Sequence, residues 1–395
     1  MKILYTTGYA GTGKSTALLE LVKTLDTDTS VVLAPTHKAL SRLRHEIESD
    51  IELKTIHSLL GWIPGINEDA KHIGHIDTVI KLDKGINEYK NIVIDEAGMM
   101  SEDMIVTIVS RLEALNDYET DHITIHLFLD PYQLLPVRGI QIQTDHSFTT
   151  NLTTQHRSES PDVVNLFTKF VNYLEGTNTT DLSTPDSDNV IIVDSIEEFK
   201  KPDRLLAYTN QAVGFYNKLI AAKFDIHSFI GQTVQLGNQI DTYKVDDYYE
   251  PSIDQLLDHY NTGKLVLQNS QINKLYLAEN LQALLDNQYI KFILTNHRVI
   301  PVVEGIGFAN EVRNVAKQAA IEDKKAFKDV YALGRAFTMD YTFASTVHKA
   351  QGSEFDRVWV NKSDIQKSIF RGSYKNYARL MYVAISRAKQ KIFII

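Results

Sequence analysis

A glycine-rich segment near the beginning of the chain limits the fold more than any other part of the sequence. Residues Gly8 to Ser15 are G-Y-A-G-T-G-K-S, which fits the pattern G-x-x-x-x-G-K-[ST]. The segment follows the strand-like run Ile3 to Tyr5 and precedes the apolar helical pattern Ala17 to Leu25. In this position the motif is typical of a phosphate-binding loop, whereas the same glycines elsewhere would predict only a turn. The chain is therefore expected to contain a parallel sheet with helices on its faces.

The residue types of this loop suit a phosphate group. Glycine leaves room for backbone N–H groups to point at phosphate oxygens, and the following helix directs its positive end toward the anion. Lys14 would place a charge at the β and γ phosphates, and Ser15 would bind Mg²⁺. We therefore expect ATP and Mg²⁺ as cofactors, bound at Gly8, Gly11, Gly13, Lys14, Ser15 and Thr16.

Two adjacent carboxylates, Asp95 and Glu96, follow the apolar run Asn91 to Ile94. A buried strand would deliver them to the carboxyl edge of the sheet, where ligand sites form in open α/β folds. Asp95 is predicted to hold Mg²⁺ together with Ser15, and Glu96 is predicted to polarise the attacking water. The alternative for such a pair is a helix N-cap.

Short apolar or β-branched runs alternate with helical patterns over most of the chain, which indicates parallel α/β construction. A chain of 395 residues, 43% of them hydrophobic, can build at least two domains. The polar stretch Glu175 to Asn189 follows a helical pattern and indicates the main boundary. The prediction is an α/β fold of two parallel-sheet lobes with small inserted subdomains. The first lobe would take 1–57 and 91–185 with an insert at 58–90, and the second lobe would take 186–230 and 336–395 with an insert at 231–335.

The two inserts differ from the lobes in their patterns. In the first, Ile73 to Leu82 followed by Asp83-Lys84-Gly85 predicts two strands and a turn. The second contains the strand patterns Tyr289 to Leu294 and Val299 to Val303. Its last part, Glu311 to Arg335, has helical spacing with most basic residues off the apolar stripe, which fits either a solvated helix face or an arm that contacts nucleic acid.

The composition excludes several classes of site. The chain has no cysteine, which removes disulfides, thiolate zinc sites and a cysteine nucleophile. No apolar stretch approaches the roughly 20 residues that span a bilayer, and Met1 leads into a strand-like run without the features of a secretory signal. We expect a cytoplasmic protein without a membrane partner, in the host cytoplasm if its source is viral. The net charge of -9 argues against a surface wholly dedicated to nucleic acid, yet it allows a basic groove.

The order of further motifs resembles that of the superfamily 1 helicases, with most similarity to the phage Dda and RecD-like branch. In the first lobe these motifs are L-A-P-T-H-K at Leu33 to Lys38, T-I-H-S at Thr55 to Ser58, D-E-A-G at Asp95 to Gly98 and L-D-P-Y-Q-L-L-P-V at Leu129 to Val137. Later motifs are Q-H-R at Gln155 to Arg157, T-V-H-K-A-Q-G-S-E-F-D at Thr346 to Asp356 and L-M-Y-V-A-I-S-R-A-K at Leu380 to Lys389. The resemblance covers both lobes and implies that each is RecA-like.

The sequence departs from the family pattern in places. Relatives usually have Gly-Asp where this chain has Leu129 and Asp130, and Leu135 stands where proline is common. The strand end before this motif is therefore expected to differ, while Asp130 and Gln133 keep their positions. The glutamine motif by which relatives read adenine, upstream of the first strand, has no counterpart in the sequence, and this leaves the selectivity for ATP open.

In the family, several of these motifs supply residues to the nucleotide. The resemblance implies that Gln133 senses the γ phosphate, that Arg157 lies near it, and that Arg387 is an arginine finger. An arginine suits this task because its planar fork spans phosphate oxygens bidentately. His156 would stack on adenine or belong to an exposed loop, and the turn Gly352 to Glu354 would approach the nucleotide. The predicted catalytic set is Lys14, Glu96, Gln133, Arg157 and Arg387.

The resemblance also implies contacts with a nucleic-acid strand. Trp62 would either stack on a base or hold the first insert against its lobe. Asn210 follows a strand pattern and matches a segment that contacts the nucleic-acid backbone in relatives. The predicted set is Pro35, Thr36, His37, Lys38, Thr55, His57, Ser58, Trp62, Asn210, Thr346, His348 and Lys349.

The main hypothesis is a monomeric ATP-dependent DNA helicase that acts on single-stranded DNA and forked duplex, with the 5′-to-3′ polarity that the resemblance implies. A single-strand-binding or replication protein is a candidate partner. One alternative is a translocase that remodels protein–nucleic acid complexes with little unwinding, and another is a nucleotide-gated binding switch. ATP turnover stimulated by oligonucleotide separates a motor from a switch. The choice between DNA and RNA and the biological pathway are left open by the sequence.

Overall fold

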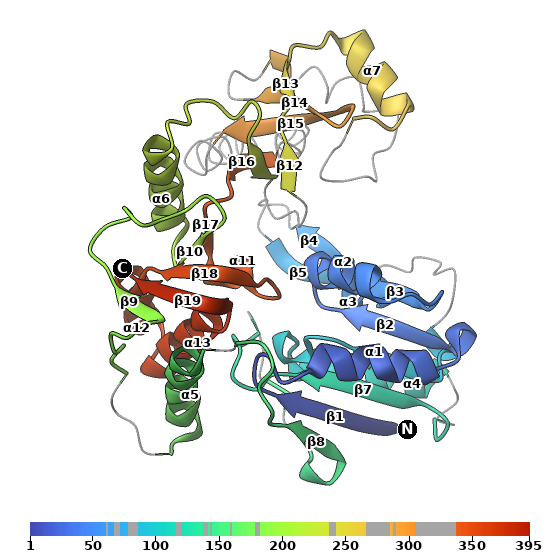
Figure 1. Cartoon of the computed structure of the whole chain (residues 1–395). Coiled ribbons are helices and arrows are strands. Elements are labelled where there is room, and N and C mark those ends of the chain that lie inside the picture. Colours follow the sequence, from blue (N-terminus) through green and yellow to red (C-terminus); the bar gives the residue numbers. More distant parts are fainter. Residues whose placement is uncertain are drawn as a thin grey trace. The chain divides into compact units, whose positions relative to one another are not determined.

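The computed structural model describes most of the chain, and the statements of structure below refer to that part. It comprises residues 1–60, 62–66, 72–77, 86–115, 120–136, 141–142, 144–158, 160–177, 182–236, 242–265, 285–286, 290–304 and 337–395. The chain divides into two compact units, each described by itself (Figure 1). The first unit contains Met1–Gly65, Gly74–Tyr208 and Val347–Ile395, and the second contains Ile66–Ile73 and Thr209–Thr346.

The first unit contains a parallel sheet that the first 152 residues build. Its strand order is β3-β2-β6-β7-β1-β8, and neighbouring strands pair in parallel throughout. In the order of the chain, the strands are β1 (Lys2–Gly8), β2 (Ser30–Ala34), β3 (Glu52–Thr55), β6 (Asn91–Ile94), β7 (Thr124–Leu129) and β8 (Thr149–Leu152). A parallel sheet brings the carboxyl ends of its strands to one edge, so the segments after β1, β2, β6 and β7 meet there.

Helices cover both faces of this sheet, as alternation along its strands requires. Val32 packs with the helices on one face, and its neighbour Leu33 packs with those on the other. The first face carries α1 (Lys14–Thr24) and α2 (His37–Glu46), and the opposite face carries α3 (Ile56–Leu59) and α4 (Glu102–Leu115). Short 3₁₀ turns complete this layer at Thr27–Thr29 (η1), Ile86–Glu88 (η2), Ala97–Met99 (η3) and His146–Phe148 (η4).

A second parallel sheet in the same unit contains β10-β18-β19-β9 in that order. Its strands are β9 (Val190–Ile192), β10 (Arg204–Ala207), β18 (Phe355–Val360) and β19 (Ala388–Ile394). Trp359 is fully buried and stacks on Phe393 at 4.4 Å between ring centroids, in accord with the alternating pattern around it. The accompanying helices are α5 (Pro161–Glu175), α11 (Val347–Ala350), α12 (Lys362–Arg371) and α13 (Tyr374–Ile385). Both sheets are thus the parallel α/β layers that the strand and helix patterns predict, and the α/β fold class is confirmed.

Helix α5 packs on the second sheet, and this differs from the boundary that the sequence suggests. The helix begins after Ser160, whose side chain accepts a hydrogen bond from Val163 N, and it ends at Gly176. Its apolar face, which includes Phe167 and Phe170, lies in one core cluster with α13 and the second sheet. The range 91–185 proposed for the first lobe therefore includes a helix that packs on the other sheet. Apolar periodicity shows that a helix has a buried face, but it does not show which sheet that face will cover.

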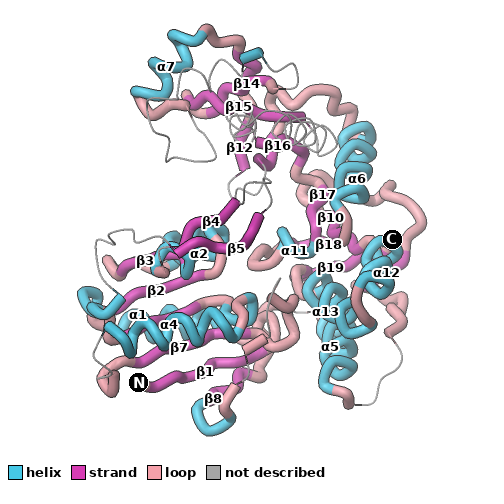
Figure 2. The backbone as a smooth tube through the Cα atoms, turned by 180° about the vertical axis from the view of Figure 1, so that it is seen from behind, coloured by secondary structure: helices cyan, strands magenta, loops and turns pink. Residues whose placement is uncertain are grey.

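The first insert contains a two-stranded ribbon, although not at the residues expected. Strand β4 (Trp62–Ile66) and strand β5 (His72–Asp77) form one two-stranded sheet (Figure 2). The sequence pattern places both strands between Ile73 and Leu82, whereas the structure pairs an earlier segment with β5. The expected second strand and the turn Asp83-Lys84-Gly85 fall in 78–85, outside the described residues.

The second unit contains a further sheet with the order β12-β11-β16-β15-β14-β13. Its strand pairs are antiparallel except β15 and β16, which are parallel. The elements of this unit are α6 (Asn210–Lys223), β11 (Thr233–Leu236), β12 (Thr242–Lys244), β13 (Asp247–Tyr249), α7 (Ile253–Asn261), β14 (Lys291–Thr295), β15 (Arg298–Glu304), β16 (Phe337–Tyr341) and β17 (Ala344–Thr346). The segment Glu311 to Arg335, for which a helix face or an arm is expected, lies outside the described residues. Among the helices that the structure describes, none is long and apolar enough to span a bilayer.

Candidate nucleotide site

The phosphate loop connects β1 to α1 at the carboxyl edge of the first sheet. Gly13 is the N-cap of α1 and makes no side-chain cap, so no side chain at that position covers the first amides of the helix. The Lys14 Nζ atom donates to the carbonyl oxygens of Gly8 and Tyr9, at 2.8 and 2.6 Å. Burial lowers the pKa of the Lys14 ammonium, and the nearby charge of Asp130 opposes that shift. The loop thus presents backbone N–H groups and one buried ammonium, the combination that binds phosphate.

The segment Gln155 to Arg157 lies against this loop. The backbone N–H of His156 donates to the Gly11 carbonyl at 2.8 Å, and Gln155 Nε2 donates to the Ala10 carbonyl at 2.7 Å. Gln155 Oε1 also accepts from the backbone N–H of Arg157 at 2.8 Å. A Cβ atom added at Gly11 would lie 2.0 Å from Gln155 Oε1 and 2.5 Å from Arg157 Cβ, so a side chain at this position would have to displace the segment.

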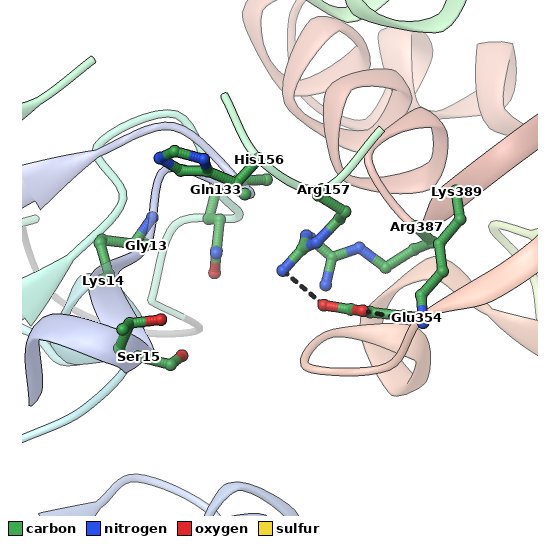
Figure 3. A pocket seen from close by; sticks show the side chains of 12 residues that line it. Gly13, Lys14, Ser15, Gln133, His156, Arg157, Glu354, Arg387 and Lys389 are labelled. Carbon is green, nitrogen blue, oxygen red and sulfur yellow. Dashed lines mark ion pairs between the residues drawn. The ribbon is translucent and has the colours of Figure 1, made fainter. Parts of the chain in front are cut away.

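A cavity of about 390 Å³ opens between these segments and the end of α13 (Figure 3). It is lined by Ala10, Gly11, Gly13, Lys14, Ser15, Thr16, Gln133, His156, Arg157, Glu354, Arg387 and Lys389. Four lining side chains are cationic and one, Glu354, is a carboxylate, although the whole chain carries a net charge of -9. Figure 3 shows Lys14 and Ser15 on one side of the cavity and Arg387 and Glu354 on the other. A local excess of positive charge in an acidic chain indicates a polyanionic ligand.

Glu354 connects the cations on one side of the cavity. Its Oε1 atom accepts from Arg157 Nη2 at 2.8 Å, and its Oε2 atom lies 3.5 Å from Lys389 Nζ. Partial burial would raise the pKa of this carboxyl, but the charges of Arg157 and then Lys389 outweigh burial, and the pKa is lowered. The carboxylate therefore holds Arg157 at the edge of the cavity.

Arg387 follows α13 and is almost fully buried. Its guanidinium donates to the Val383 carbonyl at 3.1 Å and to Ser386 Oγ at 2.9 Å. Burial, followed by the nearby charge of Arg157, lowers the pKa of Arg387 to about 10, so it is still a cation at neutral pH. Among the described residues its bonded partners are neutral oxygens, which leaves its charge available to an anion in the cavity.

The two predicted carboxylates lie at the carboxyl end of β6 and do not line the cavity. Asp95 is buried and accepts from Arg42 Nη2 of α2 at 2.5 Å. Burial and the adjacent Glu96 raise the pKa of Asp95 to about 6, and Arg42 opposes this shift. Glu96 occupies a left-handed backbone conformation, with φ of 51°, as N-cap of the turn η3, and its side chain makes no cap. The pair thus ends the strand as expected, but its nearest cation is an arginine that the motif pattern does not indicate.

Gln133 lies in the turn after β7 and lines the cavity. Its Nε2 atom is 3.5 Å from Asp130 Oδ2, a long separation for a hydrogen bond. Tyr132 N donates to the other carboxylate oxygen of Asp130 at 3.0 Å. Gln133 is therefore held loosely at a position from which it can reach a ligand.

The residues predicted to contact nucleic acid lie outside this cavity. Thr36 and Thr55 are the N-caps of α2 and α3, and their side chains accept from Ala39 N and Ser58 N. Pro35 and His57 are half-buried, and Ser58 is exposed. The side chains of His37, Lys38 and Trp62 lie outside the described part of the chain.

The remaining residues predicted to contact nucleic acid are His348, Lys349, Asn210 and Thr346. His348 is exposed in the short helix α11, with its ring 6.2 Å from that of Tyr208, and Lys349 follows it. Asn210 begins α6 after its N-cap Thr209, and Thr346 ends β17, both in the second unit. These four residues lie at, or next to, the ends of strands and helices.

The cavity brings together most of the predicted nucleotide residues but not all of them. Gly8, Asp95, Glu96 and Gly352 are absent from its lining, while Ala10 and Lys389 line it without having been predicted. Arg42, Gln155 and Tyr382 were also missed, although each contacts a predicted residue or loop. Gln155 and Tyr382 lie inside motifs, and the signal that could have found Tyr382 is a hydroxyl in the otherwise apolar run Leu380 to Ile385. Arg42 offered no comparable signal, because basic residues on a helix are usually solvated.

Comparisons with known proteins agree with this geometry. Residues 1–168 match the family model described as AAA domain, and residues 341–395 match the one described as UvrD-like helicase C-terminal domain. An uncharacterized protein of Acanthamoeba polyphaga mimivirus is 23% identical over 97% of this chain and 95% of its own length. The Pif1 helicase from Bacteroides in complex with ADP-AlF3 and ssDNA has 16% identity and a TM-score of 0.51, with 100% of this chain and 88% of that chain covered. The Pif1 helicase from Candida albicans has 16% identity and a TM-score of 0.54, with 100% of this chain and 90% of that chain covered.

The matched regions coincide with the two parts of the site. The AAA domain match contains the phosphate loop and Asp95, and the UvrD-like match contains Glu354 and Arg387. The solved relatives share the two-lobe fold over the whole chain. The phosphate loop and the buried Arg387, which line one cavity, thus lie in the two segments that match the AAA domain and the UvrD-like helicase C-terminal domain.

Proposed function

We propose that this chain is an ATP-dependent DNA helicase that moves along single-stranded DNA with 5′-to-3′ polarity and couples Mg-ATP hydrolysis to strand separation. The observation that carries the proposal is that Lys14 of the first sheet and Arg387 of the second line one cavity with an excess of positive charge. A triphosphate bound there would contact both lobes. Its cleavage would remove contacts on both sides, which is the requirement for a motor that opens and closes.

The cationic side chains would serve the phosphates. Lys14 would exchange its two carbonyl partners for the β and γ phosphates, and Arg157 would exchange Glu354 for the γ phosphate. Arg387 is already held by neutral oxygens and would stabilise the charge that develops on the transferred group. Gln133 would detect the γ phosphate, because its bond to Asp130 is long and easily exchanged.

The residues present also suit a magnesium ion. The hydroxyl of Ser15 lines the cavity and the carboxylate of Asp95 ends β6, and such hard oxygen donors are the ligands that Mg²⁺ prefers. When bound, Mg²⁺ would neutralise phosphate charge. Glu96, next in the chain, would orient the attacking water and accept its proton.

The proposal that the polymer is DNA rests on the relatives and on the motif segments. Solved Pif1 helicases are described in complex with ssDNA and in DNA unwinding at forked dsDNA. In this chain, the strand would contact the helix starts at Thr36 and Thr55 together with Asn210, Thr346 and His348. A single-strand-binding or replication protein would be the natural partner of such an activity, with the helicase acting as a monomer.

The decisive experiment measures ATP turnover by the full chain with and without single-stranded DNA and RNA oligonucleotides. The expected result is turnover that rises at least tenfold with DNA, followed by unwinding of a duplex with a 5′ tail and little unwinding with a 3′ tail. A rate that is slow and indifferent to oligonucleotide would favour the nucleotide-gated switch and overturn the proposal. The variant Lys14→Ala is the control for contaminating ATPases.

The ribbon β4–β5 supports unwinding over remodelling without unwinding, because a two-stranded ribbon inserted in the chain between α3 and β6 could separate paired strands. Replacing residues 63–84 by a short glycine-serine linker removes the ribbon. The replacement stops before Ile86, which is buried in the core of the first sheet. We expect DNA-stimulated turnover to persist and unwinding to be lost. Equal loss of both activities would contradict this role, and undiminished unwinding would also do so.

A further inference from the structure

One tyrosine of α13 makes hydrogen bonds with both nucleotide loops of the first sheet. Tyr382 is fully buried. Its hydroxyl accepts from the Ala10 N–H in the phosphate loop at 2.7 Å and donates to Asp130 Oδ2 at 2.6 Å. A phenol can do both because it has one donor and free acceptor lone pairs. Two loops that belong to the first sheet are therefore joined through one atom of a helix that belongs to the second.

Core packing alone does not account for this hydroxyl. The Tyr382 ring packs edge to face against Phe167 at 6.0 Å and Tyr132 at 6.2 Å between centroids. Phenylalanine would fill the same space, since the ring makes these contacts. A buried hydroxyl is retained only where it has partners, and both partners here belong to loops that face the cavity.

The Asp130 carboxylate, which accepts a hydrogen bond from the Tyr382 hydroxyl, is also approached by the side-chain amide of Gln133. Gln133 Nε2 is 3.5 Å from the same oxygen, Asp130 Oδ2, to which Tyr382 donates. The backbone N–H of Tyr132 holds the other oxygen at 3.0 Å, so the carboxylate cannot turn freely. A rotation of Gln133 toward a ligand in the cavity would remove one side-chain donor from Asp130 Oδ2 and leave it the hydrogen bond from Tyr382.

The C-terminal end of α13, which follows Tyr382, contacts both arginines of the cavity. One turn after Tyr382, the Ser386 carbonyl accepts from Arg157 Nη1 at 3.2 Å, and Arg387 Nε donates to the Val383 carbonyl. Near the middle of α13, Arg379 donates to the carbonyls of Pro131 and Gln133 at 2.7 and 2.6 Å. The contacts of α13 with the loop that bears Gln133, and with both arginines of the cavity, are thus spread over about two helical turns, roughly 11 Å along the helix axis.

We propose that Tyr382 is a positioning residue that transmits the state of Gln133 and the phosphate loop to α13, and thereby sets where Arg157 and Arg387 stand. The inference rests on the proposed function, because it takes the γ phosphate as the ligand that draws Gln133 away from Asp130. In this arrangement the Tyr382 hydroxyl contributes to the difference between the ATP and ADP states. It does not touch the nucleotide.

The test compares two buried tyrosines of the same helix. Tyr382→Phe removes the bridging hydroxyl, and Tyr377→Phe removes a hydroxyl that meets Gln366 of α12 while its ring packs on Phe170. The chain has no cysteine, so cysteines introduced at Ser110 of α4 and Asn165 of α5, both exposed, can carry spin labels without background. The distance between the labels is measured with Mg-ADP and with a non-hydrolysable ATP analogue.

We expect the unsubstituted protein to show different distances with the two nucleotides. Tyr382→Phe should reduce that difference by at least half and lower kcat at least tenfold with little change in KM, whereas Tyr377→Phe should keep both. Asp130→Asn should reproduce the effect of Tyr382→Phe, and the double variant should be no worse than either single variant. An undiminished difference in Tyr382→Phe, or equal losses in Tyr377→Phe, would overturn the inference.

The same experiment separates this inference from the proposed function. Absence of DNA-stimulated turnover in the unsubstituted protein would count against the helicase, whatever the distances show. DNA-stimulated turnover that Tyr382→Phe leaves intact would sink the role of Tyr382 alone. Because the distances depend on nucleotide and not on turnover, the contribution of the hydroxyl is decided in either case.

Discussion

The close approach of Gly11 to Gln155 can be tested with a second glycine as its control. Gly11 and Gly176 both have left-handed backbones, with φ of 84° and 75°. Alanine in this conformation costs roughly 1–2 kcal/mol at either position. At Gly176 nothing lies within 4 Å of the added Cβ, but at Gly11 the Cβ would lie 2.0 Å from Gln155 Oε1.

Alanine at Gly11 must therefore displace the Gln155 side chain. That side chain makes hydrogen bonds to the Ala10 carbonyl and the Arg157 N–H, and the loss of each costs about 1 kcal/mol. We expect Gly176→Ala to lower the free energy of unfolding by roughly 1–2 kcal/mol and Gly11→Ala to lower it by about 3–4 kcal/mol. Only Gly11→Ala should also weaken the binding of an ATP analogue, because Arg157 moves with Gln155.

Urea denaturation measures the two losses, provided that the slope of free energy against denaturant is unchanged. Fluorescence titration with a labelled ATP analogue measures affinity on the same samples. Equal losses of stability in the two variants would refute the steric reasoning, since the shared backbone term would then explain both. Unchanged affinity in Gly11→Ala would show that the Gln155 segment does not organise the cavity.

Three further predictions concern the charged groups of the site. Lys14→Ala should abolish ATP hydrolysis while single-stranded DNA still binds, as filter binding and turnover assays would reveal; retained turnover would contradict the assignment of the loop. Arg42→Met should leave buried Asp95 without its cation, lower stability by about 3 kcal/mol and reduce hydrolysis at least tenfold, whereas the exposed Arg44→Met on the same helix should be neutral; equal effects would argue against the pair. Glu354 has a lowered pKa in the folded chain, so its ion pairs contribute stability above the ordinary value near 4.5 and lose it as the pH falls through the lowered pKa. Denaturation of Glu354→Gln should accordingly show a deficit in stability at pH 7 that shrinks as the pH falls below 4.5, and a deficit constant with pH would contradict the linkage.

Much of the layered fold follows from local patterns. Apolar runs such as Val31 to Ala34 identify buried strands wherever they occur, because a strand covered on both faces is apolar at every position. The phosphate loop was located from its glycines and from the helical pattern Ala17 to Leu25, because the motif and the change of periodicity are adjacent in the chain; the structure begins that helix at Lys14. The same holds for Asp95 and Glu96, which end a short apolar strand.

The contacts between distant segments depended on the tertiary structure. Helix α5 has a clear apolar face, but only packing shows that the face covers the second sheet. The pairing of β4 with β5 was not predicted, because turn residues alone do not determine which segments will pair. Arg42 and Tyr382 act on residues 53 and 252 positions away, Asp95 and Asp130, and no local spacing reports such distances.

The sequence by itself thus determined the class of fold, the position of the glycine-rich loop and most of the residues that line the cavity. These properties depend on short-range geometry, in which neighbours along the chain are neighbours in space. Only the tertiary structure decided that Lys14 and Arg387 face one cavity, that Arg42 neutralises Asp95 and that the Tyr382 hydroxyl joins two loops. Those relations arise when sheets and helices pack, because packing brings together side chains whose separation along the chain carries no information about their distance in space.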